Sequence, residues 1–389
     1  MNIKQTSSIK NSQATNKVQL NVGIINPGYG YERVSYALPP LESFAYKRLY
    51  TLPVHRIMSS HTKFYRETPV VFDYGVELLH TWNSLPICRK PFVVSFECEL
   101  PRYLGDVLPW QVSAGIKVLR SRRCQKILAL SEAAKYRLIA EFKKKGYDDL
   151  IEKITVFRGG VSLPIEPKVD YPLEGTLKLL FVGTDAVRKG IVPLFKACEA
   201  LIKQGRNIHL TVIGGFSEEC YVHGEFIPDI KAIETQLRES NWVSFMGRVA
   251  IADVLKQMKS HDLLMFPTFD ESLGWVPVEA GLLGVPTVAT DIFALPELID
   301  HNKTGYLISI DKDRSRRFNG LDTVGEELCR HLNKANKDIE LGLLSILEHL
   351  DDNRWLIEQW GRAAKDKLVV LYNPKVAASE INSIYRSAI

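Results

Sequence analysis

The sequence lacks the features that mark membrane, secreted and disulfide-rich proteins. No apolar run reaches the roughly 20 residues that a membrane-spanning helix needs. The opening stretch, MNIKQTSSIKNSQATNKV, is polar and has no secretory-signal core, so residues 1–17 are predicted to be a disordered tail. The six cysteines are scattered without a C-x-x-C pair, which is typical of reduced thiols. These absences predict a cytoplasmic protein.

Several catalytic signatures are absent as well. The chain has no G-x-x-x-x-G-K-[ST] phosphate loop, no H-E-x-x-H motif and no G-x-S-x-G motif. Residues 26–33, NPGYGYER, lack the G-x-G-x-x-G spacing of a dinucleotide-dependent oxidoreductase or epimerase, which makes that class a poor candidate. The remaining composition, 46% hydrophobic and 24% charged over 389 residues, is that of a globular chain long enough for two domains.

Positive charge is concentrated between Lys117 and Lys145, where ten Lys or Arg residues stand against two glutamates. Such a face favours peripheral contact with an anionic membrane on its inner side, or with a phosphorylated acceptor. A solvated helix surface is the more common explanation. The stretch contains two aromatic residues, Tyr136 and Phe142, among ten cations, which is not the regular interleaving typical of a nucleic-acid site, so nucleic acid is not an expected partner.

Short apolar runs alternate with helical stretches along the chain. The expected strands are Val18–Ile25, Val76–His80, Phe92–Phe96, Lys126–Leu130, Ile154–Phe157, Leu177–Val182, His209–Ile213, Val243–Met246, Leu263–Pro267, Pro286–Thr290 and Gly305–Ser309. The expected helices are Val107–Arg120, Glu132–Lys145, Val187–Gln204, Asp229–Ser240, Ala252–Ser260 and Trp275–Leu283, with a helical tail over Asp351–Ile389. This alternation favours parallel sheets covered by helices on both faces.

A polar run with three prolines, residues 161–172, separates the two halves of the pattern and is typical of an extended linker. We therefore expect an α/β fold of two Rossmann-like domains facing each other across a cleft, residues 18–165 and 174–365. Residues 366–389 are expected to form a helix that packs back on the first domain. Ligands of such sheets bind beyond the carboxyl ends of the strands, which places the expected site in the loops there.

The segment 270–286, DESLGWVPVEAGLLGVP, combines a strand-to-helix loop with two glutamates. Proline fits only the first turn of a helix, so Pro277 predicts a helix that begins near residues 274–276, and Gly284 marks its end. Glu271 is then expected in the loop and Glu279 in the first helical turn. Both are expected on the cleft side.

Free backbone N–H groups of Ser272, Leu273 and Gly274 at this helix start favour an anion such as a diphosphate. The carboxylates of Glu271 and Glu279 would repel that anion, so their expected partners are hydroxyl groups, which a carboxylate accepts in pairs. A diphosphate flanked by hydroxyl groups describes a nucleotide sugar. The alternative is that Glu279 only interacts with the helix dipole and that Glu271 is merely exposed.

A second candidate anion site follows another strand. Residues 180–190, LFVGTDAVRKG, predict a strand, a glycine turn and a helix that opens with Arg188 and Lys189. Two cations beside free N–H groups would stabilise a departing diphosphate. An exposed Arg-Lys pair without a ligand is the simpler alternative.

Several of these elements occur in a fixed order: FVG at 181–183 with RKG at 188–190, TVIGG at 211–215, VSFMG at 243–247, the two glutamates, GVP at 284–286 and PEL at 296–298. The series resembles the retaining GT-B glycosyltransferases of glycosyltransferase family four, whose E-x7-E motif matches Glu271 and Glu279. The resemblance covers residues 154–308. It implies metal-independent hexosyl transfer from a UDP- or GDP-sugar to a hydroxyl of a glycan or lipid-linked acceptor, with retention of anomeric configuration and without a further cofactor. Polysaccharide, lipopolysaccharide or other glycan synthesis is the implied process.

The resemblance also implies residue roles. Lys189 and Arg188 would bind the diphosphate, Glu271 the donor sugar and Glu279 the ribose diol. The other implied donor-binding residues are Gly183, Thr184, Gly247, Arg248, Val249, Ser272, Leu273 and Gly274, with Gly28 as a glycine at which the backbone could approach the donor.

Two positions depart from the family pattern. Thr184 follows the strand glycine where the family often has arginine. Glu97 ends the strand at 92–96 where the family often has a histidine that faces the sugar, and a carboxylate there could accept a sugar hydroxyl proton. Both departures support an alternative, a GT-B-shaped protein that binds a sugar nucleotide or a partner without catalysis. His80 could line the acceptor side, although a lone histidine of this kind is more often structural.

Overall fold

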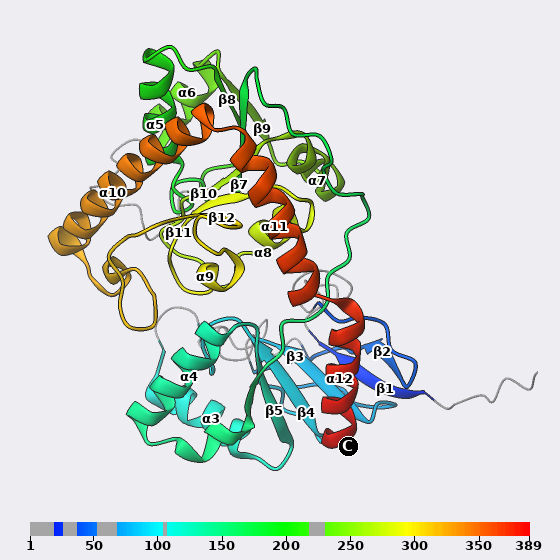
Figure 1. Ribbon diagram of the computed structural model, residues 1–389. Coiled ribbons are helices and arrows are strands. Elements are labelled where there is room, and N and C mark those ends of the chain that lie inside the picture. Colours follow the sequence, from blue (N-terminus) through cyan, green and yellow to red (C-terminus); the bar gives the residue numbers. More distant parts are fainter. Residues whose placement is uncertain (1–18, 26–36, 53–67, 104–106, 218–229) are drawn as a thin grey trace, which may run out of the picture.

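The computed structural model describes residues 19–25, 37–52, 68–103, 107–217 and 230–389. Over these residues the chain forms two separate six-stranded parallel sheets, each flanked by helices (Figure 1). The predicted tail and the predicted glycine turn at Gly28 lie outside the described residues. In the described part, no helix combines the length and the apolar composition needed to span a membrane.

The first sheet has the strand order β2-β1-β3-β4-β5-β6. Its elements are β1 (Leu20–Ile24), β2 (Phe44–Arg48), β3 (Leu78–Trp82), β4 (Phe92–Phe96), α3 (Pro109–Arg120), β5 (Cys124–Ala129), α4 (Glu132–Lys145), the short 3-10 helix η2 (Asp148–Lys153) and β6 (Ile154–Val156). The central strands β3 and β4 are buried at every residue, as expected for parallel strands covered on both faces. The sequence pattern missed β2, an edge strand that ends in two exposed basic residues.

The second sheet has the order β12-β11-β10-β7-β8-β9. Its strands are β7 (Leu177–Gly183), β8 (Ile208–Gly214), β9 (Val243–Gly247), β10 (Leu263–Phe266), β11 (Thr287–Thr290) and β12 (Gly305–Ile308). The chain runs outward from β7 through β8 to β9, then returns to β10 beside β7 and runs outward on the other side. The strand order therefore reverses between β7 and β10, which is where a doubly wound sheet opens a crevice for a ligand.

Helices cover both faces of the second sheet. They are α5 (Ile191–Lys203), α6 (Ile230–Glu239), α7 (Ile251–Ser260), α8 (Trp275–Leu282), α9 (Leu295–Leu298), α10 (Gly325–Asp352) and α11 (Trp355–Leu371), with a short 3-10 helix η3 (Asn319–Asp322). Helix α10 packs against α5, and α11 packs against α8. The sequence pattern did not single out α10, although its buried residues Leu332, Ala335, Ile339, Leu343, Ile346 and Leu350 recur at helical spacing.

The prolines at 161–172 do not form a free linker. The Lys168 ammonium donates to the His261 carbonyl oxygen at 2.6 Å and to the Asp262 carboxylate at 3.1 Å, and all three residues are buried. The Tyr171 hydroxyl donates to the Gly284 carbonyl oxygen at 2.8 Å. This segment is therefore bound along the second domain.

The C-terminal segment returns to the first domain as α12 (Pro374–Ala388), shown in red in Figure 1. Helix α11 contributes Trp360 and Leu368 to the core of the second domain, whereas α12 contributes Ile381 and Tyr385 to the core of the first. The chain thus changes from one core to the other at the junction of α11 and α12.

His80 belongs to the contact that holds α12. Its Nδ1 is hydrogen-bonded to the Tyr385 hydroxyl and its Nε2 to the Ser95 hydroxyl, both at 2.7 Å, and the ring is fully buried. Burial lowers the pKa of His80 to about 3, so the imidazole stays neutral. The structure therefore gives His80 a structural place in the core.

Candidate active site

The loops after β7 and β10 meet at the point where the strand order of the second sheet reverses. Lys189 comes from the first loop and Glu271 from the second, and the Lys189 ammonium forms an ion pair with the Glu271 carboxylate. The two side chains are only 11% and 15% exposed, although 82 residues separate them in the sequence. The topology thus places a paired cation and carboxylate where such a sheet binds its ligand.

The helix after β7 begins later than expected. Arg188 and Lys189 do not open α5 but lie in the turn before it, because α5 begins at Ile191 and Gly190 precedes it with φ of +84°. Gly183 at the end of β7 leaves room for this turn. A Cβ at Gly183 would lie 2.9 Å from Cγ of Lys189, so the absence of a side chain lets the lysine stem cross the end of the strand.

Arg188 joins the two loops. Its Nε donates to the Asp185 carboxylate at 3.1 Å and its Nη1 donates to the Asp270 carbonyl oxygen at 2.7 Å. The Arg188 carbonyl oxygen accepts from the Phe269 N–H at 3.0 Å. Arg188 therefore fixes the position of the loop that carries Glu271, and its charge lies beside Lys189. Thr184, at the start of the same turn, is exposed.

The N-terminus of α8 adds hydrogen-bond donors to this place. Gly274 precedes the helix with φ of +93°, a left-handed conformation that favours glycine. The Ser272 N–H donates to the Glu271 carboxylate at 3.0 Å. The buried N–H groups of Leu273 and Gly274 have no hydrogen-bond acceptor among the residues that the structure describes. Buried donors of this kind are rarely left unpaired, which points to an anion at this helix end.

Glu279 lies one turn further along α8 than expected. The helix begins at Trp275, so Glu279 is its fifth residue and belongs to the second turn rather than the first. It is partly exposed and lies four residues after Trp275, on the same side of the helix. Trp275 packs against the cores of both domains, so this side of α8 faces the first domain.

The third group of predicted residues follows β9. Gly247 ends that strand with φ of +66°, and Arg248 beside it is exposed. Val249 packs in a small hydrophobic cluster together with Val182 of β7 and Val276 of α8. The loop after β9 and the first turn of α8 therefore pack against the same hydrophobic cluster.

The first domain contributes Glu97, which follows β4. Its carboxylate accepts from the Arg102 guanidinium at 3.1 Å, and its N–H donates to the Asn83 side-chain oxygen at 3.1 Å. Asn83 follows β3 in a left-handed conformation with φ of 51°. Sequence reasoning did not find Asn83 or Arg102, and neither carries a motif that would have pointed to it.

Glu97 and Glu271 influence each other across the domain boundary. Burial raises the pKa of the Glu97 carboxyl, and the negative charge of Glu271 raises it further against the opposing effects of Arg102 and Asn83. Burial would also raise the pKa of Glu271, but the Lys189 ammonium and the Ser272 N–H hold that pKa below its usual range. The structure thus brings together two carboxyl groups with opposite tendencies to bind a proton.

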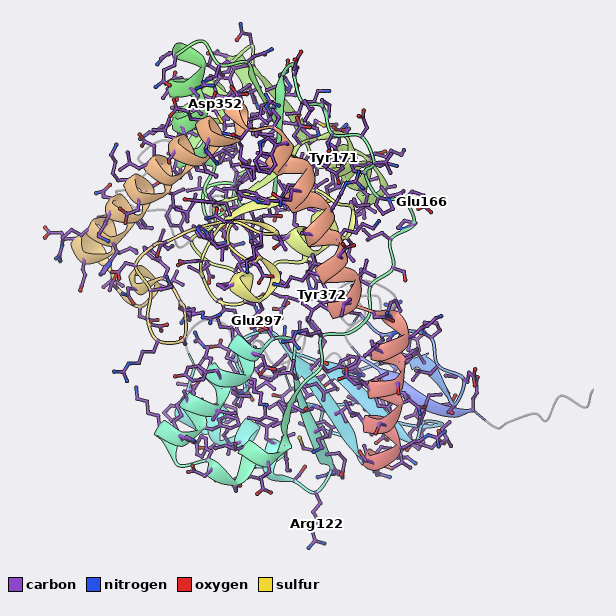
Figure 2. The ribbon with its side chains drawn as sticks, in the orientation of Figure 1. Arg122, Glu166, Tyr171, Glu297, Asp352 and Tyr372 are labelled. Carbon is purple, nitrogen blue, oxygen red and sulfur yellow. The ribbon has the colours of Figure 1, made fainter. Side chains whose placement is uncertain are left out.

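Glu297 forms a contact between the two domains. Glu297 of α9 accepts from the N–H groups of Glu132 and Ala133 at 3.0 Å and 2.8 Å, at the N-terminus of α4. The Arg158 guanidinium donates to the same carboxylate at 3.0 Å. Figure 2 shows Glu297 at the boundary between the domains. The sequence contained Glu297 within the PEL element at 296–298, but nothing in the sequence indicated its partners.

The sequence also contains an Asp-x-Asp pattern at Asp311 and Asp313, a spacing that often holds a metal ion. Here the Asp313 carboxylate accepts from the Ser315 hydroxyl at 2.8 Å and from the Arg317 N–H at 2.9 Å, while Asp311 lies 3.6 Å from His331. In the described part of the chain, no group of three or more His, Cys, Asp or Glu side chains is placed to hold a metal ion.

Comparison with known proteins agrees with this geometry. Residues 176–318 match the family model described as glycosyl transferases group 1, and this range contains Lys189, Glu271, Glu279 and Glu297. The solved structure of Anabaena HepE in complex with UDP and glucose has a TM-score of 0.60 at 13% identity and covers 95% of this chain and 100% of that one. The two facing sheets therefore form the GT-B glycosyltransferase fold, and residues 176–318 of the second domain are similar to group 1 glycosyl transferases.

Two curated relatives are similar in sequence. The D-inositol 3-phosphate glycosyltransferase of Pseudarthrobacter chlorophenolicus is 31% identical over 246 residues, which are 60% of this chain and 54% of that protein. The amylovoran biosynthesis glycosyltransferase AmsK of Erwinia amylovora is 28% identical over 167 residues, which are 40% of this chain and 38% of that protein. The matches thus span about half or less of these relatives.

Proposed function

We propose that the chain is a glycosyltransferase that moves a sugar from a nucleoside diphosphate sugar to an acceptor hydroxyl during glycan synthesis. One observation carries the proposal: Lys189 pairs with Glu271 beside the N–H groups of Leu273 and Gly274, which have no acceptor in the part of the chain that the structure describes. A diphosphate requires a cation and amide donors, and the adjoining sugar requires a hydroxyl acceptor. The names of the two curated relatives support this class of reaction.

Donor binding would redistribute the ion pair. The incoming diphosphate offers Lys189 a second, more highly charged partner, so the Glu271 carboxylate becomes free to accept hydroxyl groups of the sugar. The N–H groups of Leu273 and Gly274 bind phosphate oxygens, and Arg188 adds positive charge from the neighbouring loop. Glu279 accepts the ribose hydroxyls, and residues 247–249 lie beside the base.

Sugar transfer places its electrostatic demand on the leaving group. As the bond between the anomeric carbon and the phosphate oxygen breaks, negative charge grows on the diphosphate, where Lys189 and the α8 N–H groups stabilise it. These fixed donors are the reason we propose a metal-independent reaction. Removing one such donor typically slows an enzyme by about 100- to 1,000-fold.

We propose retention of anomeric configuration. The acceptor hydroxyl attacks the anomeric carbon on the face that the diphosphate leaves, and its proton passes to the departing phosphate oxygen. This step needs no protein base, because the departing phosphate takes the proton of the acceptor. Turnover therefore does not require a histidine at position 97, and Glu97 is compatible with it. Glu97 would accept a hydroxyl of the donor sugar, and burial raises the pKa of its carboxyl above the ordinary glutamate value.

The proposed donor is a UDP- or GDP-sugar, and the proposed acceptor is a glycan or a lipid-linked glycan. UDP and glucose are the ligands of the HepE structure, which has the same fold. We further propose that the protein acts in the cytoplasm at the inner face of a membrane. The last turn of α4, with its three consecutive lysines, supports this placement.

The function is tested by incubating the full chain with a panel of UDP-, GDP- and ADP-sugars, without metal and with a mixture of simple glycosides as acceptors. Proton NMR follows the anomeric signals of donor and product. We expect one donor to be consumed with the product anomer matching the donor anomer, and Lys189→Ala to lose at least 100-fold in rate. Nucleotide binding without any turnover would instead favour the non-catalytic alternative.

A further inference from the structure

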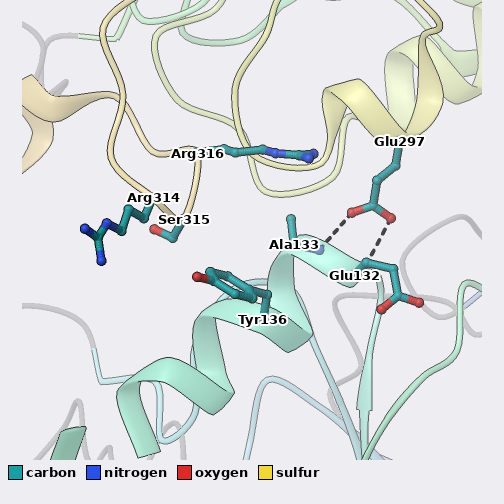
Figure 3. Close-up of a pocket in the computed structure, with 7 residues that line it drawn as sticks. All are labelled: Glu132, Ala133, Tyr136, Glu297, Arg314, Ser315 and Arg316. Carbon is teal, nitrogen blue, oxygen red and sulfur yellow. Dashed lines mark hydrogen bonds between the residues drawn. The ribbon is translucent and has the colours of Figure 1, made fainter. Parts of the chain in front are cut away.

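A cavity lies at the domain boundary, and neither Lys189 nor Glu271 lines it (Figure 3). Its volume is about 290 Å³. It is lined by Glu132, Ala133 and Tyr136 of α4, by Glu297 of α9, and by Arg314, Ser315 and Arg316 of the loop after β12. None of the residues predicted to bind the donor lines this cavity.

The polar groups on one side of this cavity are already paired. The N-terminus of α4 donates to Glu297, and Arg158 donates to the same carboxylate. The positive end of the α4 dipole is therefore neutralised by the second domain. An anion entering the cavity would have to be held by other groups.

The opposite side of the cavity carries charge without a partner. Arg314 and Arg316 are exposed, and neither side chain forms an ion pair or a hydrogen bond with any residue that the structure describes. The neighbouring cations differ in this respect, because Lys312 pairs with Asp291 at 2.6 Å and Arg317 with Asp322 at 3.5 Å. The loop thus presents two unpaired guanidinium groups to a cavity that both domains line.

The backbone of this loop is fixed. Arg316 has φ of +62°, which is uncommon for a residue other than glycine. Its carbonyl oxygen accepts from the Phe293 N–H at 2.7 Å, and its N–H donates to the Asp313 carbonyl oxygen at 3.0 Å. A non-glycine residue persists in this conformation when its surroundings impose it, and such residues are concentrated at functional sites.

Tyr136 completes the cavity from the first domain. Its ring is 55% exposed and projects from α4 toward the loop that carries Ser315 and Arg314, as Figure 3 shows. An exposed phenol ring offers a flat apolar surface against which a sugar ring can pack, and a hydroxyl that can donate a hydrogen bond. Aromatic surface beside free arginines suits a ligand that is both cyclic and anionic.

We infer that this cavity, bounded by α4 and the loop at 311–318, binds a phosphate group carried by the acceptor. The inference rests on the proposed function and specifies its acceptor. Arg314 and Arg316 lie on either side of Ser315 and both line the cavity, and Figure 3 shows their side chains extending to different sides of the loop. A phosphate carries up to two charges and oxygens on several sides, whereas one guanidinium already satisfies a planar carboxylate.

A ligand in this cavity would stabilise one arrangement of the two domains, because both domains line the cavity. Arg314 and Arg316 belong to the second domain and Tyr136 to the first, so a phosphate-bearing acceptor contacts both. α9 joins the cavity to the donor site, because a Cβ added at Gly274 would lie 2.8 Å from Leu295 of that helix. Acceptor binding would thus stabilise the arrangement in which Glu297 rests on α4.

The test uses glycerol 3-phosphate as the probe and glycerol as its neutral counterpart, with binding followed by phosphorus-31 NMR or calorimetry. The full chain is compared with the double variant Arg314→Ala/Arg316→Ala. Arg89→Ala/Lys90→Ala is the matched control, since it removes two positive charges from exposed residues that precede β4 and lie outside the basic stretch between Lys117 and Lys145.

We expect the double variant at 314 and 316 to bind the probe about tenfold more weakly, as the loss of charge-assisted hydrogen bonds predicts. The control variant and Lys189→Ala should bind it as the wild type does. Equal weakening in both double variants would show a general charge effect and would overturn the inference. Weakening in Lys189→Ala alone would place the probe in the donor site and would also overturn it.

A second arm identifies the source of the phosphate. Vesicles of phosphatidylcholine with one tenth phosphatidic acid present the group on a lipid. Co-sedimentation that is lost in Arg314→Ala/Arg316→Ala supports a lipid-borne phosphate, and binding of glycerol 3-phosphate alone supports a soluble one. If neither probe binds, the inference is wrong. Nucleotide binding by the same double variant reports on the donor site separately, so failure here leaves the proposed function intact.

Discussion

Replacing Glu297 by alanine should loosen the contact between the two domains. The substitution removes a carboxylate that accepts from two N–H groups of α4 and from Arg158. Glu297 is 14% exposed and Arg158 is 24% exposed, so water replaces the lost contacts only in part. The variant leaves Arg158 without this partner and the first turn of α4 without two acceptors.

The cost follows from the same contacts. Hydrogen bonds to a charged group contribute about 1.5–3 kcal/mol each, and breaking a buried ion pair costs about 3–5 kcal/mol. These terms describe overlapping interactions and do not add, so we expect a loss of about 2–4 kcal/mol. Glu297→Gln should cost about half as much, because its amide oxygen still accepts one N–H but carries no charge.

Urea and thermal unfolding measure this loss, and small-angle X-ray scattering measures the separation of the domains. A chain of 389 residues that unfolds in one transition should lose about 3–5 °C in its midpoint. Glu234→Ala is the control. It removes an exposed ion pair with Arg238 within α6 and should cost less than about 0.5 kcal/mol. Equal stability of Glu297→Ala and Glu234→Ala, with unchanged scattering, would refute the assignment of Glu297 as the residue that joins the domains.

Three further variants test the charges and the core. In Lys189→Ala, the loss of the lysine ammonium should raise the pKa of Glu271, because burial is then opposed only by the Ser272 N–H and Arg188. The lowered pKa of Glu271 gives the wild type extra stability above the ordinary glutamate pKa of 4.5, and the wild type loses this stability on acidification. In urea unfolding, the free energy lost in Lys189→Ala should therefore be large at pH 8 and small at pH 4. A loss that does not depend on pH would contradict this. The contribution of Glu97 to stability depends on pH in the opposite direction. Because the pKa of Glu97 is raised in the folded state, the wild type loses stability as pH rises. Glu97→Gln should therefore exceed the wild type at pH 8 and lose that advantage below about pH 4.5, and a constant difference would count against the buried charge. Tyr385→Phe removes the hydrogen bond to Nδ1 of the buried His80 and should cost about 1–3 kcal/mol equally at pH 5 and pH 8, because a pKa of about 3 keeps that ring neutral. A loss confined to low pH would show that His80 titrates.

The sequence pattern predicted the two parallel sheets because strand and helix signals are local. Runs such as residues 92–96 and 263–266 are apolar throughout, and strands buried on both faces require that composition. The structure confirms two parallel sheets flanked by helices. The pattern missed β2, whose basic end leaves little hydrophobic signal, and α10, whose apolar spacing was present in the sequence but was not recognised.

The candidate site was predictable where it depends on a loop after a strand. Glycine and proline in residues 270–286 correctly placed the start of α8, although not the turn of Glu279. The turn before α5 was harder to predict, because Gly190 ends a loop whose shape depends on Pro267 of another strand-to-helix connection. The roles of these residues in binding and transfer stay predictions.

The contacts between the domains could not be predicted from one sequence. Glu297 meets the N-terminus of α4 across 164 residues, and Glu97 is influenced by Glu271 from the opposite domain. No local pattern encodes which loops face each other, because that depends on the packing of two complete domains. Arg314 and Arg316 likewise look like ordinary surface charge until the fold places them beside α4.

The central claim is that the N-terminus of α8 and the ion pair of Lys189 with Glu271 form a nucleotide-sugar site. The most direct measurement is a thermal-shift titration of the full chain with UDP, GDP and ADP, without metal, in the wild type, in Glu279→Ala and in the control Glu234→Ala. A nucleotide at 100 times its dissociation constant should add about 2.7 kcal/mol of stability. The account predicts that one nucleotide stabilises the wild type and the control but not Glu279→Ala. Equal shifts in all three proteins, or no shift with any nucleotide, would contradict it.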